Sequence, residues 1–533
     1  MQNYEINEFA AQSSLTQVAS YFDIVDNSVK TGDTNKRYTI STNACNAPAC
    51  PIKAGGWTSF VISPQGDNMC DLYNSFISVK MNINIKHNNG VKFEAHASTR
   101  DSIGPRYWVG FKDAMDAVSQ YQLLANGQAF YTQSNAIEES YITNLATPEA
   151  VKKSDMFSKV RHEDVWKNKM GEASTRMGMV INPTTGLDSY PVDIDLKIDI
   201  RRFLPLSTIK MLPKFVGNFE IRIKFGYEGL VCTPLSPKVM LGSAANLASV
   251  SDVSRLSTQT NKFVPVGEPM KIINKITFAQ ANSVTTATIN TPIDLTLSVT
   301  DAAVIEAHSH LACFGLDDNL YQGLISRYMK ESLSFPVPTL TFQGMNGVPG
   351  NTSCDLTLAA TPRFVDTIYI LLQKNQNHRT CYENPMFTDF TLKMGSFGVI
   401  PDVQYDTSSP AFYEMVSNAF NANNDLAGFN DDVMKSLVNY TNSSTGYKSN
   451  DVSNFVLAFP VSTDFTYQQG QTSNTPVTYQ LRANMAASSP YCNDTSCIPM
   501  MGFLKDSVLA IQLRPVGPPI VALDDYDITS PAG

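Results

Sequence analysis

Two histidines separated by one residue, His308 and His310, are the most suggestive pair of metal ligands in the chain. Side chains two positions apart on a β-strand face the same way, so both imidazoles could reach one metal ion. A zinc site needs at least a third protein ligand, and the neighbouring sequence offers none. Two ordinary polar positions at the start of a strand are therefore the simpler interpretation, with a metal site as the alternative.

Four cysteines form two pairs with C-x4-C spacing, Cys45/Cys50 and Cys492/Cys497. Four thiolates could hold a zinc ion if the two ends of the chain met, or each pair could close a local disulfide. The usual spacing is C-x2-C or close to it, and both pairs lie in loops rich in Asn, Pro and Ser. The chain has nine cysteines, an odd number at scattered positions. We therefore expect reduced, structural thiols.

An acidic cluster near the end of the chain, Asp524, Asp525 and Asp527, could bind a hard cation. A solvated C-terminal tail is the simpler interpretation of these three carboxylates. The run at residues 162–164, His-Glu-Asp, could supply an acid or a base, but no nucleophile accompanies it.

The acidic side chains of residues 192–200 alternate with apolar ones, and Lys197 interrupts them. This pattern is typical of the outer face of a strand rather than of paired acid–base carboxylates. The sequence contains no nucleophile elbow, P-loop, dinucleotide-binding fingerprint, H-E-x-x-H motif or deaminase zinc signature. We therefore predict no catalytic, cofactor-binding or metal-binding residue, no cofactor and no enzyme activity.

The composition indicates a large β protein with polar loops. Only 17% of the 533 residues are charged, against about a quarter in average domains. The net charge is −9 and the basic residues are scattered, so a basic tail that packages a genome is not expected. No apolar stretch approaches the length of a membrane helix, and no signal peptide is recognisable. We expect a soluble product of the cytosol or nucleus.

Four segments alternate apolar and polar residues with a period of two, which predicts strands with one buried face. They are residues 76–88, 192–200, 219–225 and 292–299. Because Pro, Gly and Asn turns separate such runs, the pattern favours antiparallel sandwiches.

Helical patterns are few. We expect short helices at residues 204–215, 134–147 and 411–420, and an N-terminal arm with loose amphipathic spacing at residues 6–24. Residues 233–269 and 421–452 have little pattern and are predicted to be long surface loops.

The two halves of the chain also resemble each other. Residues 120–142 and residues 387–416 each contain a strand, a Gly turn, a second strand and a helix-like segment rich in Glu and aromatic residues. This similarity is consistent with two copies of one fold.

Three segments resemble double jelly-roll major capsid proteins. The run IDIRRFLPLSTIKMLPKFVGNFEIRIKFG resembles the region between the sixth and seventh strands of the first roll. The run HLACFGLDDNLYQGLISRYMKESLSFPVPTLTFQG resembles the join between the rolls, and CDLTLAATPRFVDTIYILLQ resembles the second strand of the second roll. In order, the resemblance covers roughly residues 57–520. The family includes capsid proteins of large eukaryotic DNA viruses, virophages, polinton-like elements and adenoviruses.

The resemblance implies an all-β fold of two consecutive eight-stranded antiparallel jelly rolls, with short helices and long loop insertions. We expect the following organisation: an N-terminal arm at residues 1–56; a first roll at 57–320 with an insertion at about 227–270; a second roll at 321–520 with a polar loop at about 421–452; and a C-terminal tail at 521–533.

The implied function is that of a structural capsid subunit. It would form a homotrimer with six rolls in a pseudo-hexagon, contact neighbouring capsomers and penton and minor capsid proteins, and build an icosahedral shell. No direct sequence-specific contact with nucleic acid is expected. The implied location is the virion capsid, after synthesis in the host cytoplasm and assembly in the cytoplasm or nucleus.

The division between the rolls is predicted near residues 317–328. A helix there would carry Leu320, Leu324 and Ile325 on one face and bury it in the crevice between the rolls. The Ser- and Ala-rich stretch at 241–260 is the competing boundary. Pairing of the strands at 272–278 and 293–299 with strands before residue 230 would favour the first choice.

Two other classes of function remain open: a β-sandwich attachment or carbohydrate-binding protein, and a carbohydrate-active enzyme. Both are generally secreted, and the missing signal peptide counts against them. A sugar platform also needs exposed aromatic rings, and the chain has only Trp57, Trp108 and Trp166 as tryptophans.

Overall fold

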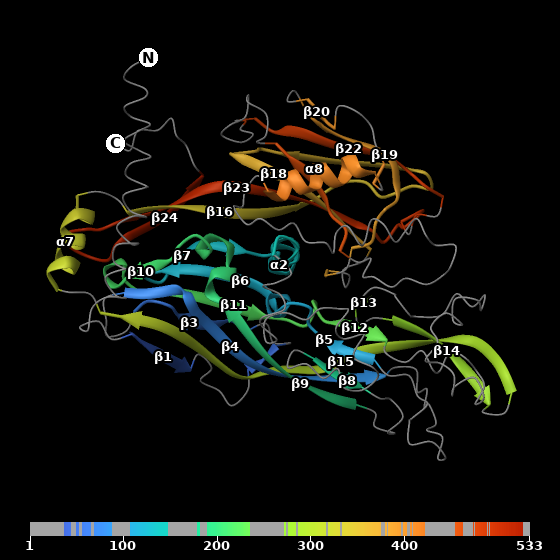
Figure 1. Ribbon diagram of the computed structural model, residues 1–533, viewed down its shortest axis with the longest axis horizontal. Coiled ribbons are helices and arrows are strands. Elements are labelled where there is room, and N and C mark those ends of the chain that lie inside the picture. Colours follow the sequence, from blue (N-terminus) through green and yellow to red (C-terminus); the bar gives the residue numbers. More distant parts are fainter. Residues whose placement is uncertain are drawn as a thin grey trace.

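The computed structural model places most of the chain in two stacked β-sandwiches (Figure 1). The described residues are 37–43, 50–52, 56–64, 69–87, 107–147, 178–181, 189–234, 271–272, 275–283, 286–315, 318–330, 333–374, 379–380, 382–395, 398–401, 406–407, 409–421, 454–461, 473, 475–487, 489 and 491–525. Among them, no helix is both long and apolar enough to cross a membrane.

The first sandwich has two main sheets. One sheet has the order β1 (Arg37–Asn43), β15 (Thr286–Phe314), β4 (Met69–His87) and β9 (Ser189–Asp199). The other has the order β3 (Thr58–Val61), β11 (Phe219–Phe225), β6 (Val118–Ala125) and β7 (Gln128–Gln133).

Shorter strands extend the first sandwich. β2 (Cys50–Pro51) and β14 (Lys275–Ser283) pair with β15, and β10 (Met211–Pro213) pairs with β4. A small sheet at one end has the order β13 (Lys271–Ile272), β12 (Val231–Pro234), β5 (Tyr107–Gly110) and β8 (Gly178–Ile181).

The second sandwich repeats the plan. One sheet has the order β16 (Leu333–Gly344), β23 (Ile498–Gln512), β18 (Val365–Gln373) and β21 (Leu457–Pro460), and β24 (Ile520–Asp525) also pairs with β23. The other has the order β17 (Ser353–Ala360), β22 (Val477–Met485), β19 (Phe387–Met394) and β20 (Val399–Ile400).

Both sandwiches are jelly rolls. If the eight main strands of each are lettered B to I in chain order, both give one sheet in the order B-I-D-G and a second in the order C-H-E-F, with every pair antiparallel. A helix follows strand F in each: α2 (Ala136–Leu145) in the first and α8 (Pro410–Asn421) in the second. The predicted fold class and the internal duplication are both confirmed.

The alternating patterns define the buried faces. In β4 the residues at 77, 79, 81, 83 and 85 are at most 3% exposed, and the inward positions of β9 and β11 are equally buried. Residues 292–299 lie in β15 as predicted, although the side chains of most of them lie outside the described residues. Period-two hydrophobicity therefore identified the strands because each sheet has one dry face.

The predicted helices at 134–147 and 411–420 are confirmed as α2 and α8, and the helix predicted at 204–215 is wrong. Residues 204–215 form a single-turn 3-10 helix at Leu204–Leu206, strand β10 and another 3-10 turn at Lys214–Val216. Pro205 and Pro213 lack backbone N–H donors and so cannot support a continuous helix. The residues between them pair with the edge of β4 instead.

The predicted terminal segments are too long. Residues 37–43 were expected in an N-terminal arm, but they form strand β1 and pair with β15 along their whole length. Residues 520–525 form β24, which pairs with β23, so the C-terminal tail does not begin at 521. β12 likewise lies within the predicted insertion at 227–270 and pairs with β5. Residues 1–36, 235–270 and 422–453, which include most of the other predicted loops and the arm at 6–24, lie outside the described residues.

No strand pairing in the described part of the chain crosses α7 (Asp318–Tyr328). β13 and β14 pair with β12 and β15, and β15 pairs with β4. A boundary at 241–260 would separate strands that share a sheet. The helix itself buries Leu324 and Tyr328 against the first core. Ile325 is half-buried, and the side chain of Leu320 is not described.

Candidate functional site: the polar interface between the two rolls

The two predicted histidines share a face of β15. Their ring centroids are 6.3 Å apart, and Nε2 of His310 is 2.7 Å from the Ser78 hydroxyl oxygen. The His310 ring stacks on Phe76 at 4.6 Å between centroids. Burial, and then the neighbouring His308, lower the pKa of His310. Within the described ranges, no group of three or more His, Cys, Asp or Glu side chains could hold a metal ion.

The other predicted site residues are dispersed. Cys492 and Cys497 carry free thiols, Cys50 lies in β2, and Cys45 is outside the described residues. Asp524 and Asp525 belong to β24, whereas Asp527 and residues 162–164 lie outside the described residues.

The acidic residues of β9 point outward, as predicted. Asp193 accepts a hydrogen bond from Asn82 at 2.7 Å, and Asp199 lies 3.3 Å from Lys197. These are contacts between neighbouring outward-facing side chains, not a paired acid–base site.

The sequence did not indicate the most unusual feature of the chain, a set of buried charged residues where the two rolls meet. α2 lies between the two sandwiches (Figure 1), and its side chains contact both. Five charged side chains on or next to it are between 1% and 6% exposed: Lys112, Asp113, Asp116, Glu138 and Glu139. Buried charges need partners, and many of these partners come from the other roll.

Charged side chains form direct polar contacts between the first roll and the second. The Arg379 guanidinium donates two hydrogen bonds to the Glu138 carboxylate, each of 2.6 Å. The Lys112 ammonium donates to the Thr380 carbonyl at 3.2 Å and to the Asn454 side chain at 3.1 Å. A two-pronged arginine–carboxylate pair fixes orientation as well as distance.

Neutral groups add to these contacts. The Tyr141 hydroxyl donates to the Phe455 carbonyl at 2.8 Å, and the Gln133 amide donates to the Leu340 carbonyl at 2.7 Å. Both donors belong to the first roll and both acceptors to the second. Each buried donor therefore depends on the other roll being in place.

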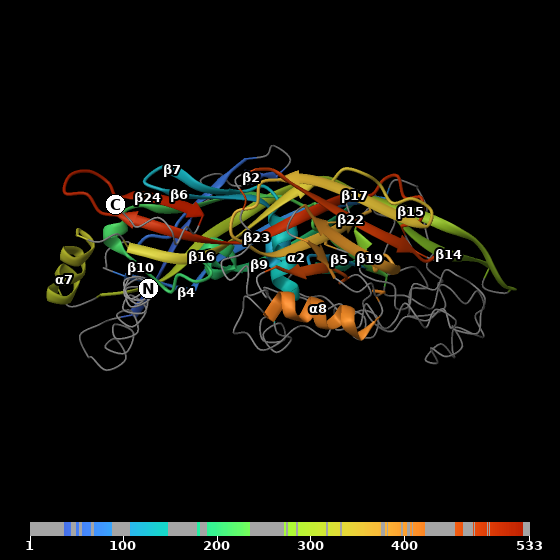
Figure 2. The ribbon, with the colours of Figure 1, turned by 90° about the horizontal axis from the view of Figure 1, so that it is seen from above.

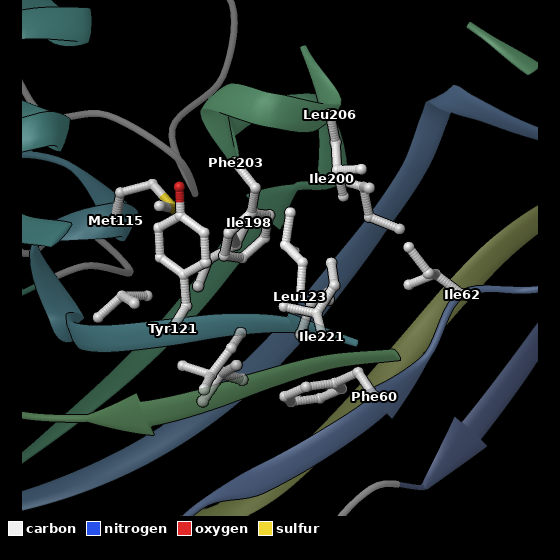
Figure 3. Packing of buried hydrophobic residues seen from close by; sticks show 14 of the residues in the cluster. Phe60, Ile62, Met115, Tyr121, Leu123, Ile198, Ile200, Phe203, Leu206 and Ile221 are labelled. Carbon is white, nitrogen blue, oxygen red and sulfur yellow. The ribbon is translucent and has the colours of Figure 1, made fainter. Parts of the chain in front are cut away.

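Glu139 extends the network into the first core. It accepts hydrogen bonds from the Tyr121 hydroxyl at 2.7 Å and from the Gln133 amide. Tyr121 packs edge-on against Phe203, with 4.9 Å between ring centroids, and Figure 3 shows both rings among the aliphatic side chains of the core. Burial raises the pKa of Glu139 to about 7.

A second part of the buried polar network lies at the 3-10 turn Ala114–Ala117, which precedes β6. Asp113 caps this turn, accepting from the Met115 N–H at 2.9 Å, and forms a 2.7 Å ion pair with Arg202. Asp116 accepts a hydrogen bond from the Ser140 hydroxyl of α2 at 2.9 Å. Burial, and then the charge of Asp113, raise the pKa of Asp116 to about 7.

The acidic side chains of this cluster outnumber the cationic ones. The cluster contains four buried acids around three cations, Lys112, Arg202 and Arg379. A fifth acid, Glu228, also interacts with Arg379 electrostatically. The acids exceed the cations by two, and two of them, Asp116 and Glu139, have raised pKa values. Burial is the main cause of both shifts, and protonation of both carboxyls would bring the net charge of the cluster close to zero.

Apolar packing surrounds this cluster on both sides. Residues of β16 and β23, including Phe335 and Leu509, pack in the core of the first roll. Tyr141, Ile142 and Leu145 of α2 pack in the core of the second. The two cores therefore interlock, with the ion pairs enclosed between them.

The chemistry available here is structural. The Ser140 hydroxyl lies beside the Asp116 carboxyl, but both are buried, and the carboxyls of the cluster are bound by fixed partners. The adjacent acids at 138–139 are a visible sequence feature on a predicted helix. Arg379, the partner of Glu138, is 241 residues away in the chain, so this pairing could not be predicted.

The chain is similar in structure to several viral proteins. The major capsid protein of mavirus has 10% sequence identity, with 93% of this chain and 92% of that chain covered and a TM-score of 0.48. A chain of the Sputnik virophage has 10% identity, coverage of 93% and 89%, and a TM-score of 0.48. The Faustovirus major capsid protein has 8% identity, coverage of 90% and 91%, and a TM-score of 0.41.

No family model and no curated protein sequence matches the chain. The assignment of two jelly rolls rests on the strand orders and registers described above.

Proposed function

We propose that this chain is a structural major capsid protein that assembles as homotrimeric, pseudo-hexameric capsomers into an icosahedral shell. The observation that carries the proposal is the pair of jelly rolls with identical strand order, locked to each other by a buried ion-pair interface. Three such chains would present six similar rolls around one axis. Closed symmetry would then repeat one interface many times, as a shell requires.

The fixed angle between the rolls supports the same function. A hinge between domains would be expected to have a small, wet interface. Here charged groups are buried with partners from both rolls, and breaking such a pair is strongly unfavourable. Such an interface favours a chain that acts as one rigid unit, which suits a subunit of a regular lattice.

The proposal includes the partners and location implied by the sequence resemblance. The chain would contact neighbouring capsomers, penton proteins and minor capsid proteins in the virion, and it would have no catalytic role.

Size-exclusion chromatography with light scattering, followed by negative-stain imaging, tests the proposal on purified full-length protein. We expect a particle of three times the 58.6 kDa chain mass, with a triangular or hexagonal outline. Monomers at all protein concentrations, with no larger assembly under any condition, would refute it.

A further inference from the structure

Two cysteines of the first roll lie directly opposite each other on neighbouring strands. Cys70 in β4 and Cys313 in β15 are partners in the antiparallel register, and both side chains are fully buried in the first core. Both are thiols in the structure. In the registers that the structure describes, no other cysteine faces a cysteine: the partners of Cys50, Cys232 and Cys354 are Val304, Val109 and Ala483.

The hydrogen-bonding pattern of β4 brings these two side chains close together. The N–H of Leu72 donates to the Lys210 carbonyl, on the side of β4 that pairs with β10. Alternate residues of a strand direct their backbone groups to the same side, so Cys70 and Cys313 form a non-hydrogen-bonded pair. The Cα atoms of such a pair are about 4.5 Å apart, which lies within the range of about 4.4–6.8 Å found in disulfides.

The pair lies at the end of the first roll that leads into the second. β15 ends at Phe314, and α7 begins at Asp318. Strand β10, which pairs with residues 69–71, lies at the end of the molecule that carries α7 in both views (Figure 1 and Figure 2). A covalent bond between the two cysteines would therefore enclose most of the first roll and hold its exit to α7 in place.

We propose that Cys70 and Cys313 form a latent disulfide site that, once oxidised, ties β4 to β15 beside the join between the rolls. The inference goes beyond the proposed function, because the pair lies within one chain and does not depend on assembly. Thiols persist in the reducing interior of a cell, and disulfides persist outside it. The site would thus be open in a newly folded chain and closed after exposure to an oxidising environment.

The folded strands protect the two thiols. A hydrogen bond with the Cys313 thiol, and then burial, raise the pKa of Cys70 well above its usual range, and the thiolate is the reactive form. The cysteines are next to the last residue pair of the ladder, Met69 with Phe314. Strand ends open more readily than strand centres, so oxidation proceeds through local opening at this end.

The oxidant is a low-molecular-weight disulfide such as oxidised glutathione. In the opened strand end, the thiolate of one cysteine attacks this disulfide, forms a mixed disulfide and releases one small thiol. The second cysteine attacks the protein-side sulfur of the mixed disulfide and releases the second small thiol. Two protein thiols are oxidised and one small disulfide is reduced, and the two protons leave on the small thiols.

Peptide mapping of the full-length chain tests the site. Reduced protein is incubated with oxidised glutathione, both without urea and in urea below the unfolding midpoint. The remaining thiols are then alkylated, and the protein is digested without reductant for mass spectrometry. We expect a pair of peptides linked through Cys70 and Cys313, which forms faster in urea and disappears with dithiothreitol. Absence of this link under both conditions, or Cys70 joined only to glutathione or to another cysteine, overturns the inference.

Thermal melting measures the effect of the link. Oxidation should raise the melting temperature by on the order of 10 °C, because a disulfide that closes a long loop restricts the unfolded chain. Cys313→Ala should abolish this rise. The matched control is Cys354→Ala, which removes a buried thiol of the second roll that lies opposite Ala483, and it should keep the rise.

A rise that persists in Cys313→Ala, or a fully linked sample with no rise, contradicts the proposed tie between the strands. The mapping uses the wild-type chain alone, so its result decides the inference even where Cys313→Ala does not fold.

Discussion

Removing Arg379 tests whether the ion pair between the rolls holds them together. In Arg379→Ala the Glu138 carboxylate, whose side chain is 1% exposed, loses both 2.6 Å hydrogen bonds. A hydrogen bond to a charged group contributes about 1.5–3 kcal/mol, and leaving one partner of a buried pair uncompensated costs about 3–5 kcal/mol. We therefore expect the free energy of unfolding to fall by about 3–5 kcal/mol.

The assay is urea unfolding followed by tryptophan fluorescence and circular dichroism, in a double-mutant cycle with Glu138→Gln. Both single variants, Arg379→Ala and Glu138→Gln, remove the same interaction. The loss of unfolding free energy in the double variant should therefore be much smaller than the sum of the losses in the two single variants. The control is Arg482→Ala. The Arg482 side chain is 67% exposed and 3.9 Å from Asp355, and an exposed pair contributes only about 0–1 kcal/mol.

Two results would refute the proposed role of this pair. One is a destabilisation by Arg379→Ala no larger than that of Arg482→Ala. The other is strict additivity of the Arg379 and Glu138 variants, because it would mean that the two side chains do not interact in solution.

Three further predictions concern pH, the helix between the rolls and the N-terminus. Burial raises the pKa of Glu139 from 4.5 to about 7, so the folded chain binds this proton more tightly than the unfolded chain. The free energy of unfolding should therefore fall as the pH rises from about 4.5 to 7, by on the order of 3 kcal/mol from this group. Asp116, with a pKa of about 7, acts in the same direction. Glu139→Gln should flatten the profile of unfolding free energy measured from pH 4.5 to 8, and an unchanged slope would contradict the assignment. Leu324→Asp places a charge at a position in α7 where the side chain is 2% exposed, and it should reduce the trimer yield measured by light scattering. The control Gln322→Asp, at an exposed position of the same helix, should not. Equal effects of the two substitutions would show that α7 contributes nothing specific. Deletion of residues 1–36 should leave both rolls folded but impair assembly. Deletion of residues 1–43 also removes β1 and its pairing with β15, so it should lower the melting temperature. Equal melting temperatures of the two deletion variants would show that β1 is dispensable.

Local sequence patterns determined much of the fold. The alternating runs identified β4, β9 and β11, because a strand with one dry face must alternate apolar and polar side chains. The repeated strand, turn, strand and helix pattern also located the duplicated unit from β6 to α2 and from β19 to α8. These features depend on neighbouring residues alone, so a single sequence contains them.

Features that depend on pairing with distant residues were decided by the tertiary structure. Residues 37–43 have no strong alternation, and they become a strand only because β15 offers an open edge. Residues 204–215 have helix-like spacing, but the two prolines and the edge of β4 favour turns and a short strand.

The buried interface is the clearest case. Glu138 and Glu139 are ordinary surface residues of a helix by sequence, and an exposed acidic face would have been the natural prediction. Stacking the second roll on α2 removes them from water and supplies Arg379 from 241 residues away. Composition and spacing cannot specify that partner, because its position depends on how two separately patterned sandwiches pack against each other.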